Sequence, residues 1–266
     1  MRKDNSHFLS VVVPAYKQEK TIVEDIKQIK RVLEKMRYDY ELIIVVDGMI
    51  DKTYQKAKKL QGKKIKVVGY KTNRGKGYAV RYGMARTKGD LIAFIDAGMD
   101  IDPNGLAMIL EHMEWYGADI IVGSKRHPAS QVEYPFLRKI YSFGYQMLIW
   151  FLFGLKVKDT QTGLKIFKRE VLEKVLPRLL VKKFAFDVEL LAVARRLGFK
   201  KIYEAPIKIN PEQFKFTSTI KFKTVWEMLI DTLAVFYRLH ILHYYDDKNK
   251  RKWRWDPELN FKVNIG

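Results

Sequence analysis

The first half of the chain alternates short apolar runs with longer segments of mixed polarity. The apolar runs have the length of buried strands, and the segments between them repeat apolar residues with the helical period. This alternation is typical of βαβ units and predicts an α/β fold, a mostly parallel sheet with helices on both faces. Strands are expected at residues 8–13, 41–46, 65–69, 91–95 and 120–123, and helices at 21–36, 51–60, 77–86 and 104–115.

The second half contains two long segments, 136–153 and 224–245, that are apolar and aromatic. The charged residues of the later segment gather on one helical face, so it fits a helix between the domain and a lipid surface, and equally a plain core helix. The basic run 248–252, followed by Trp253 and Trp255, favours lipid, because cations with interfacial aromatic rings match an anionic headgroup layer.

This pattern divides the chain into two parts. Residues 1–210 are expected to form the α/β domain, with an apolar interface helix at 136–155 inside it. Residues 211–266 are expected to form an amphipathic helix and a basic aromatic tail that associate with a membrane. The longest uncharged run, 140–155, reaches roughly 24 Å as a helix, short of a hydrocarbon core of about 30 Å. No membrane span is therefore predicted.

Composition narrows the class of protein. The 266 residues suit one domain with an appendage. The chain has no cysteine, which excludes disulfides, thiolate metal sites and cysteine nucleophiles. The formal net charge of +20 implies a polyanionic neighbour such as a nucleotide, a nucleic acid or an anionic membrane. The N-terminus shows no export signal, so a cytoplasmic rather than secreted protein is expected.

Polar or acidic groups follow four of the predicted strands. The carboxyl ends of parallel strands meet at one edge of a sheet, which is where ligands bind in open α/β folds. The four groups should therefore line one crevice. They are residues 14–19, Asp47 with Gly48, residues 73–77, and residues 96–100.

The run Gly75-Lys76-Gly77 is similar to a phosphate-binding loop but fails both common patterns. A Walker loop needs a glycine where Tyr70 stands, and the dinucleotide fingerprint needs one where Val80 stands. A helix N-terminus with a lysine and two glycines still suits a diphosphate. The alternative is a simple glycine-lysine turn before a helix.

Asp96 and Asp100 bracket the end of the most apolar predicted strand. Two carboxylates beside a basic phosphate site favour a divalent cation, Mg²⁺ or Mn²⁺, held between protein and diphosphate. A pair of aspartates in a solvated turn is the alternative.

Taken together, these motifs resemble family 2 glycosyltransferases over residues 8 to about 245. The first group comprises Val11 to Tyr16, Val46-Asp47-Gly48, Asn73 to Met84, Gly89-Asp90 and Asp96-Ala97. The later group narrows the resemblance to the dolichyl- and polyprenyl-phosphate hexose synthases. It comprises Gly123 to Arg126, Arg138 with Ser142, Asp159 to Phe167, and Phe186 to Leu191.

The resemblance implies that residues 1–210 form a catalytic domain with a GT-A-type, Rossmann-like fold and a nucleotide sugar at the strand ends. It implies Lys76 for the diphosphate and Asp96 for both the diphosphate and the metal. The chain departs from the family in having one acid, Asp47, before the glycine of the second strand, and Gly98 in place of the second motif acid. The cation is therefore assigned to Asp96 and Asp100. The implied nucleoside contacts are Pro14, Ala15, Tyr16, Glu19 and Asp47.

The resemblance also implies where the acceptor binds. Arg138 and Ser142, with Lys125 and Arg126, would hold the phosphate of a polyprenyl or dolichyl phosphate. A lipid phosphate is largely dianionic near pH 7, since its second pKa is about 6, so it can attack the sugar directly without a general base. Asp96, Arg138 and Ser142 are the expected catalytic residues, and direct attack predicts inversion at the anomeric carbon.

The resulting prediction is an inverting, metal-dependent hexosyltransferase peripheral on the inner face of the cell membrane. UDP-glucose is the favoured donor and GDP-mannose the next. A non-lipid acceptor and a degenerate nucleotide-sugar binder remain alternatives, and a nucleic-acid-binding module is disfavoured because no such motif appears. A membrane-protein partner or a homo-oligomer stays open. Asp187 and Glu189 lie where processive relatives keep a base, but a helix cap and a solvated or hydrogen-bonded glutamate are at least as well supported.

Overall fold

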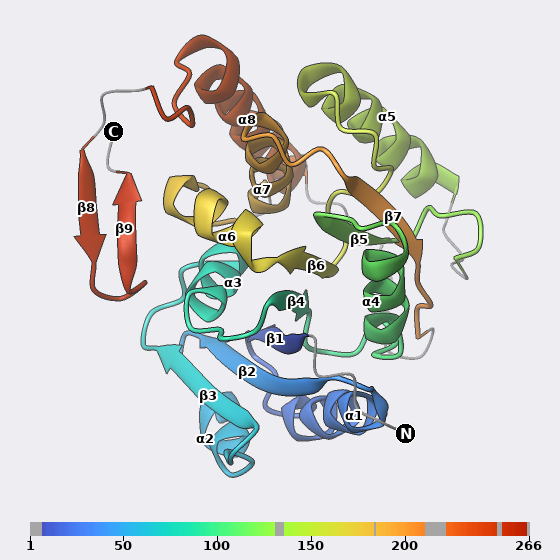
Figure 1. Cartoon of the computed structure of the whole chain (residues 1–266), viewed down its shortest axis with the longest axis vertical. Helices are drawn as coiled ribbons and strands as arrows, with labels where there is room; N and C mark the ends of the chain where they lie inside the picture. Colours follow the sequence, from blue (N-terminus) through green and yellow to red (C-terminus); the bar gives the residue numbers. More distant parts are fainter. Residues whose placement is uncertain (1–6, 131–135, 184, 211–221, 249–251, 265–266) are drawn as a thin grey trace.

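The computed structural model describes residues 7–130, 136–183, 185–210, 222–248 and 252–264, with the main chain alone at 136–141 and 222–224. Seven strands form one twisted central sheet in the order β3-β2-β1-β4-β6-β5-β7 (Figure 1). β6 runs antiparallel to β4 and β5, and the other neighbouring pairs are parallel. The strands are β1 (Phe8–Ala15), β2 (Asp39–Asp47), β3 (Ile65–Tyr70), β4 (Leu91–Ile95), β5 (Ile120–Ser124), β6 (Leu164–Lys168) and β7 (Ile202–Pro206).

Each face of the sheet has its own hydrophobic core, as the period-two pattern of buried strands requires. In β1, Val12 belongs to one core, and Val11 and Val13 belong to the other. One face is covered by α1 (Ile22–Lys35), α2 (Thr53–Lys58) and α4 (Gly105–Trp115). The other is covered by α3 (Lys76–Met84), α5 (Phe136–Phe153), α6 (Arg169–Val175), α7 (Phe186–Arg196) and α8 (Phe222–Phe236).

The predicted α/β fold is thus confirmed, with its five predicted strands at or near their expected positions. β6 and β7 are additional. β6 is an interior strand between β4 and β5 although its sequence, LKIFK, contains two lysines. Lys165 is fully buried and forms an ion pair with Asp187. Since a lysine counts as polar in the hydrophobic pattern, that pattern alone could not reveal an interior strand here.

The C-terminal part differs from the single long helix expected at 224–245. α8 ends at Phe236, a π-helical turn η2 (Tyr237–Ile241) follows, and Tyr244 and Tyr245 are then buried. The expected aromatic tail is a β-hairpin, β8 (Trp253–Asp256) with β9 (Phe261–Asn264). Its two strands pair antiparallel, with Trp253 opposite Asn264 and Asp256 opposite Phe261.

Among the described residues, no helix combines the length and apolar character needed to cross a bilayer. The contact of α5 and α8 with lipid stays a prediction, as does the division of the chain at residue 210.

Candidate active site

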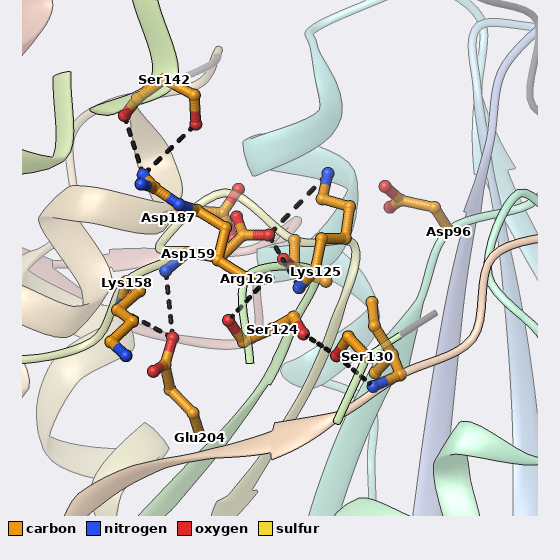
Figure 2. Close-up of polar contacts among 12 residues, drawn as sticks. Asp96, Ser124, Lys125, Arg126, Ser130, Ser142, Lys158, Asp159, Asp187 and Glu204 are labelled. Atoms are coloured by element: carbon orange, nitrogen blue, oxygen red, sulfur yellow. Dashed lines mark hydrogen bonds and ion pairs between the residues drawn. The ribbon is translucent and has the colours of Figure 1, made fainter. Parts of the chain in front are cut away.

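The strand ends bring the predicted polar residues to one edge of the sheet. β1, β2 and β4 all end there, and β5 is followed there by Lys125 and Arg126. β6 runs the opposite way, so the segment that leads into it reaches the same edge. Figure 2 shows Asp96, which follows β4, together with Lys125 and Arg126 of the loop after β5 and with the carboxylate of Asp159 from the segment before β6. This edge is where an open α/β sheet binds its ligands.

Asp96 lies at the centre of this edge. Its Oδ2 accepts a hydrogen bond from the Lys76 ammonium at 2.7 Å, and its amide donates to the carbonyl oxygen of Gly163 at 2.8 Å. The Asp96 carboxylate fills the space that a Cβ at position 163 would need, which explains the glycine there. Its other oxygen, Oδ1, is buried and has no hydrogen-bond partner among the described residues.

The Lys76 ammonium stays charged at this edge. Desolvation by itself lowers the pKa of Lys76, but the charge of Asp96, with Asp187 and Asp159 further away, raises it on balance. A lysine held in its charged form next to the crevice suits a diphosphate.

Asp100 brings a second carboxylate within electrostatic range of Asp96. Its side chain is exposed. Desolvation and the charge of Asp96 raise the pKa of Asp100, while Lys125 acts in the opposite direction. No cluster of three or more histidine, aspartate or glutamate side chains suited to a metal ion occurs in the described part of the chain. The partnerless Oδ1 of Asp96 and the repulsion between the two carboxylates nevertheless fit an Mg²⁺ or Mn²⁺ ion that takes its remaining ligands from a diphosphate and water.

The loop between these two aspartates is fixed by its main chain. Gly98 has a φ of +94°, in the left-handed region that favours glycine, and its amide donates to Oδ2 of buried Asp25 at 3.0 Å. The carbonyl of Met99 accepts from the side chain of Asn210 at 2.8 Å. The replacement of the second motif acid by Gly98 is therefore consistent with the local backbone, and it leaves Asp100 as the second carboxylate.

Asp47 is buried and organises the loop that precedes Lys76. Its carboxylate accepts hydrogen bonds from the side chain of Asn73 at 3.0 Å and from the amides of Arg74 at 2.7 Å and Gly75 at 3.0 Å. All three donors belong to the same loop. The structure therefore gives Asp47 a role in shaping the site, and its contact with a nucleoside stays a prediction.

The two glycines around Lys76 are explained by close packing. The Gly77 amide donates to the carbonyl of Lys182 at 2.9 Å. A Cβ at Gly75 would lie 2.6 Å from that carbonyl oxygen, and a Cβ at Gly77 would lie 2.5 Å from the side chain of Phe186. The amide of Gly77 is thus already occupied, so a diphosphate here would depend on the Lys76 ammonium.

The other predicted nucleoside residues follow β1. Pro14 and Ala15 are buried, whereas Tyr16 is 43% exposed at the edge of the sheet. Glu19 accepts a hydrogen bond from the amide of Lys52 at 3.1 Å and so ties this loop to the start of α2. Tyr16 is the residue of this group whose ring is best placed to meet a ligand from solution.

The loop after β5 and helix α5 bring together three of the four predicted acceptor residues. The Arg126 guanidinium donates to the carbonyl oxygen of Ser142 at 3.0 Å and to its hydroxyl at 3.5 Å (Figure 2). Lys125 donates its amide to Asp159 at 3.1 Å, and its ammonium lies 4.0 Å from the same carboxylate. Arg138 belongs to α5, but its side chain lies outside the described residues.

A small cavity of about 50 Å³ opens beside these residues. Its walls come from α5 and from the segment that leads into β6, and most of them are polar. The polar groups that line it are hydroxyl, amide, ammonium and carboxylate groups. The residues lining it are Ser142, Tyr145, Gln146, Ile149, Val157, Lys158, Asp159, Thr160 and Gln161.

A buried ion pair behind Asp96 was not predicted. The Lys165 ammonium lies 2.6 Å from Oδ1 of Asp187 and donates to the carbonyl of Thr162 at 2.6 Å. Lys165 and Lys76 both lie near the Phe94 ring, at 5.1 and 5.5 Å from its centroid. Asp187 therefore balances a buried lysine instead of capping a helix. The one sequence signal was a lysine inside an apolar run.

Glu189 is also a structural residue. It is fully buried, and its carboxylate accepts hydrogen bonds from the amides of Leu180 at 3.0 Å and Val181 at 2.9 Å, and from the Tyr245 hydroxyl at 2.7 Å. Desolvation raises the pKa of Glu189, and these hydrogen bonds oppose the shift. This confirms the hydrogen-bonded alternative of the sequence analysis.

Comparison with known sequences decides the family. The profile described as "Glycosyl transferase family 2" matches residues 10–176. The chain belongs to this family. It is 32% identical to a human protein named dolichyl-phosphate beta-glucosyltransferase over 243 residues, covering 85% of this chain and 74% of the human protein. A Saccharomyces cerevisiae protein of the same name is 31% identical over 226 residues, which cover 77% and 67% of the two chains.

Solved structures confirm the GT-A-type fold of this family 2 glycosyltransferase. Glucosyl-3-phosphoglycerate synthase from Mycobacterium tuberculosis, in complex with Mn²⁺, UDP and phosphoglyceric acid, aligns over 97% of this chain and 87% of its own with a TM-score of 0.65 at 19% identity. Mannosyl-3-phosphoglycerate synthase from Rubrobacter xylanophilus aligns over 97% and 83% with a TM-score of 0.68 at 15% identity. At these identities the similarity concerns the fold.

Proposed function

We propose that this glycosyltransferase moves one glucose from UDP-glucose to the phosphate of a polyprenyl or dolichyl phosphate, with inversion at the anomeric carbon. The observation that carries the proposal is the meeting of two groups at one sheet edge. The donor corner consists of Asp47, Lys76, Asp96 and Asp100. The acceptor side consists of Lys125, Arg126 and Ser142, and the charge of Lys125 reaches Asp100.

The relatives' names support the lipid phosphate acceptor and a β-linked product, which inversion of an α-linked UDP-glucose would give. UDP with Mn²⁺ in a structure of the same fold supports the metal and the nucleotide. Asp96 and Asp100 would hold Mg²⁺ or Mn²⁺, which supplies positive charge against the departing diphosphate. GDP-mannose is the second candidate donor.

The chemistry then needs positioned charges and no protein base. A phosphate oxygen of the acceptor forms the new bond to the anomeric carbon, and the bond from that carbon to the diphosphate oxygen breaks with its electron pair. Lys76 stabilises the charge that develops on the diphosphate. Arg126 and Ser142, with Arg138 as the sequence predicts, hold the incoming phosphate and reduce its repulsion from the donor.

The surface next to Ser142 suits a lipid. Exposed apolar side chains follow Ser142 along α5, and others lie on α8 and η2. The Tyr145 hydroxyl and Thr232 Oγ1, 2.9 Å apart, join the two helices, which lie near each other in Figure 1. We propose that this apolar surface meets the cytoplasmic leaflet of a membrane. It consists of Phe143, Met147, Trp150, Phe151, Trp226, Ile230, Leu233, Tyr237 and Ile241.

Transfer of labelled glucose from UDP-glucose to a short polyprenyl phosphate, with Mn²⁺ or with chelator, tests the reaction. Formation of a metal-dependent β-linked glycolipid is expected, and GDP-mannose, unphosphorylated polyprenol and phosphoglyceric acid serve as the comparisons. Efficient transfer to phosphoglyceric acid alone would establish a soluble acceptor. Nucleotide binding without transfer to any of these acceptors would favour the alternative of a degenerate nucleotide-sugar-binding protein.

Liposome flotation tests the membrane surface separately. Phe151→Ser with Trp226→Ser removes two side chains that are 80% and 57% exposed, and flotation with anionic liposomes should fall. Trp115→Ser is the matched control, because Trp115 is 84% exposed on α4, outside the apolar surface. Equal flotation of wild type, the double variant and Trp115→Ser would contradict the membrane role of this surface.

A further inference from the structure

The C-terminal hairpin is fastened to the loop that leads into the donor corner. β9 packs against the short 3₁₀ helix η1 (Leu176–Arg178), and the turn between β8 and β9 carries Glu258. The Glu258 carboxylate receives two hydrogen bonds from the Arg74 guanidinium, one of them 3.0 Å long. It also accepts from the Tyr78 hydroxyl at 2.6 Å.

The Arg74 side chain contacts a carboxylate and two aromatic rings in this arrangement. Its guanidinium donates to the Tyr78 hydroxyl at 2.7 Å and lies over the rings of Tyr78 and Tyr70, at 4.8 and 5.4 Å from their centroids. A planar guanidinium paired with a carboxylate and stacked on aromatic rings has a well-defined orientation. The side chain of Arg74 is therefore anchored to a residue that is distant in sequence.

The main chain of the same residue is anchored from the opposite direction. Asp47 accepts from the amides of Arg74 at 2.7 Å and Gly75 at 3.0 Å. Gly75 has a φ of +96°, and Lys76 begins α3 directly after it. Glu258 from outside and Asp47 from inside thus fix two residues whose path sets the position of Lys76.

A second tether links the C-terminal segment to the other side of Lys76. The Tyr245 hydroxyl donates to Glu189, which holds the amides of Leu180 and Val181. The loop that they begin places the Lys182 carbonyl on the Gly77 amide. Residues 245 and 258 therefore support the two loops that enclose the start of α3.

We propose that Glu258 is a positioning residue for the donor and that the C-terminal hairpin completes the diphosphate site. Through Arg74 it sets the path of the chain into Lys76, and Lys76 meets the diphosphate of the nucleotide sugar. This inference rests on the proposed function. Because the side chains of Arg74 and Glu258 are 35% and 49% exposed, their ion pair adds little to global stability, and its main effect is on local geometry.

The test compares Glu258→Gln with Asp246→Asn. Asp246 forms an equivalent two-bonded pair with Arg196, at 2.7 and 2.6 Å, in the same C-terminal segment but at the far end of α7. We expect Glu258→Gln to raise the Kd for UDP with Mn²⁺, measured by calorimetry, about 5- to 10-fold. It should raise the KM for UDP-glucose by a similar factor, with a smaller change in kcat and a Tm within a few degrees of wild type. Asp246→Asn should bind UDP within 2-fold of wild type.

A double-mutant cycle measures the coupling between Arg74 and Glu258 in UDP binding. Arg74→Met should raise the Kd for UDP about as much as Glu258→Gln does. The Kd of the double variant should not exceed the higher of the two single-variant values. UDP binding by Glu258→Gln within 2-fold of wild type, or an equal loss in Asp246→Asn, would overturn the positioning role. Failure of sugar transfer by a wild-type protein that binds UDP would overturn the proposed function alone. Failure of the wild type to bind either UDP or GDP would overturn both.

Discussion

The donor corner and the acceptor side of this glycosyltransferase are built differently. In the donor corner, Lys76 is paired with Asp96. Asp47 is buried and accepts three hydrogen bonds from one loop. On the acceptor side, the Arg126 guanidinium is held by two neutral oxygens of exposed Ser142. The donor geometry is therefore fixed by one ion pair and by hydrogen bonds to Asp47. On the acceptor side Lys125 lies 4.0 Å from Asp159, whereas the charge of Arg126 stays available for an incoming phosphate.

This difference has a physical reason. A donor diphosphate must be held while its bond breaks, which requires groups that are already oriented. A lipid phosphate has to arrive from a membrane and leave again, which favours an accessible cation beside an apolar surface. Substitutions on the two sides should accordingly differ in kind as well as in size.

The largest effect is expected from Asp96→Ala. This change removes the carboxylate that pairs with Lys76 and that we assign to the metal, so kcat should fall by at least about 10³-fold, roughly 4 kcal/mol. Steady-state transfer with saturating Mn²⁺ measures it, and circular dichroism checks the fold. A variant that retains a tenth of the wild-type rate would contradict the role of Asp96 in donor activation.

The next effect concerns the buried pair behind the donor corner. Lys165→Met leaves Asp187 buried without its cation, and the free energy of unfolding should fall by about 3–5 kcal/mol. Lys168→Met is the matched control in the same strand, because Lys168 lies 3.4 Å from Asp119 with a side chain that is 36% exposed, and it should cost less than about 1 kcal/mol. Urea unfolding of both variants measures the difference, and equal losses would show that burial of the pair is unimportant.

Arg126→Met tests the acceptor side. Loss of charged hydrogen bonds to a phosphate, worth about 1.5–3 kcal/mol, should raise the KM for polyprenyl phosphate by about 10- to 100-fold and leave UDP affinity unchanged. Arg138→Ala should likewise chiefly affect the use of lipid phosphate. Arg31→Met serves as the control, because Arg31 has an exposed side chain on α1 that pairs with Glu24. An equal loss of donor hydrolysis and of transfer would contradict the assignment of acceptor and donor to separate sides.

The smallest expected effect is a pH dependence from Glu189. The pKa of Glu189 is raised in the folded protein above its ordinary value of 4.5, chiefly by desolvation. The folded state therefore binds this proton more tightly, so the stability contributed by Glu189 is present below pH 4.5 and is lost as the pH rises through the raised value. Urea unfolding of wild type and Glu189→Gln across this range should show wild type gaining relative stability toward acid. A constant difference would place the folded pKa at its ordinary value.

Much of the fold and of the donor corner followed from the sequence. Short apolar runs and helical periods are local signals, and parallel topology then places every strand end at one edge. Asp47, Lys76 and Asp96 could therefore be grouped from the order of strands along the chain. The family motifs added Arg126 and Ser142, which the structure places in contact.

The tertiary structure alone decided what those residues touch. A lysine such as Lys165 reads as polar along the chain, and only the approach of Asp187, 22 residues later, makes it a core residue. The same holds for Glu258, which lies 184 residues from Arg74. Sequence patterns report neighbours on one strand or helix, whereas charge pairs and loop tethers depend on which distant segments the folded sheet brings together.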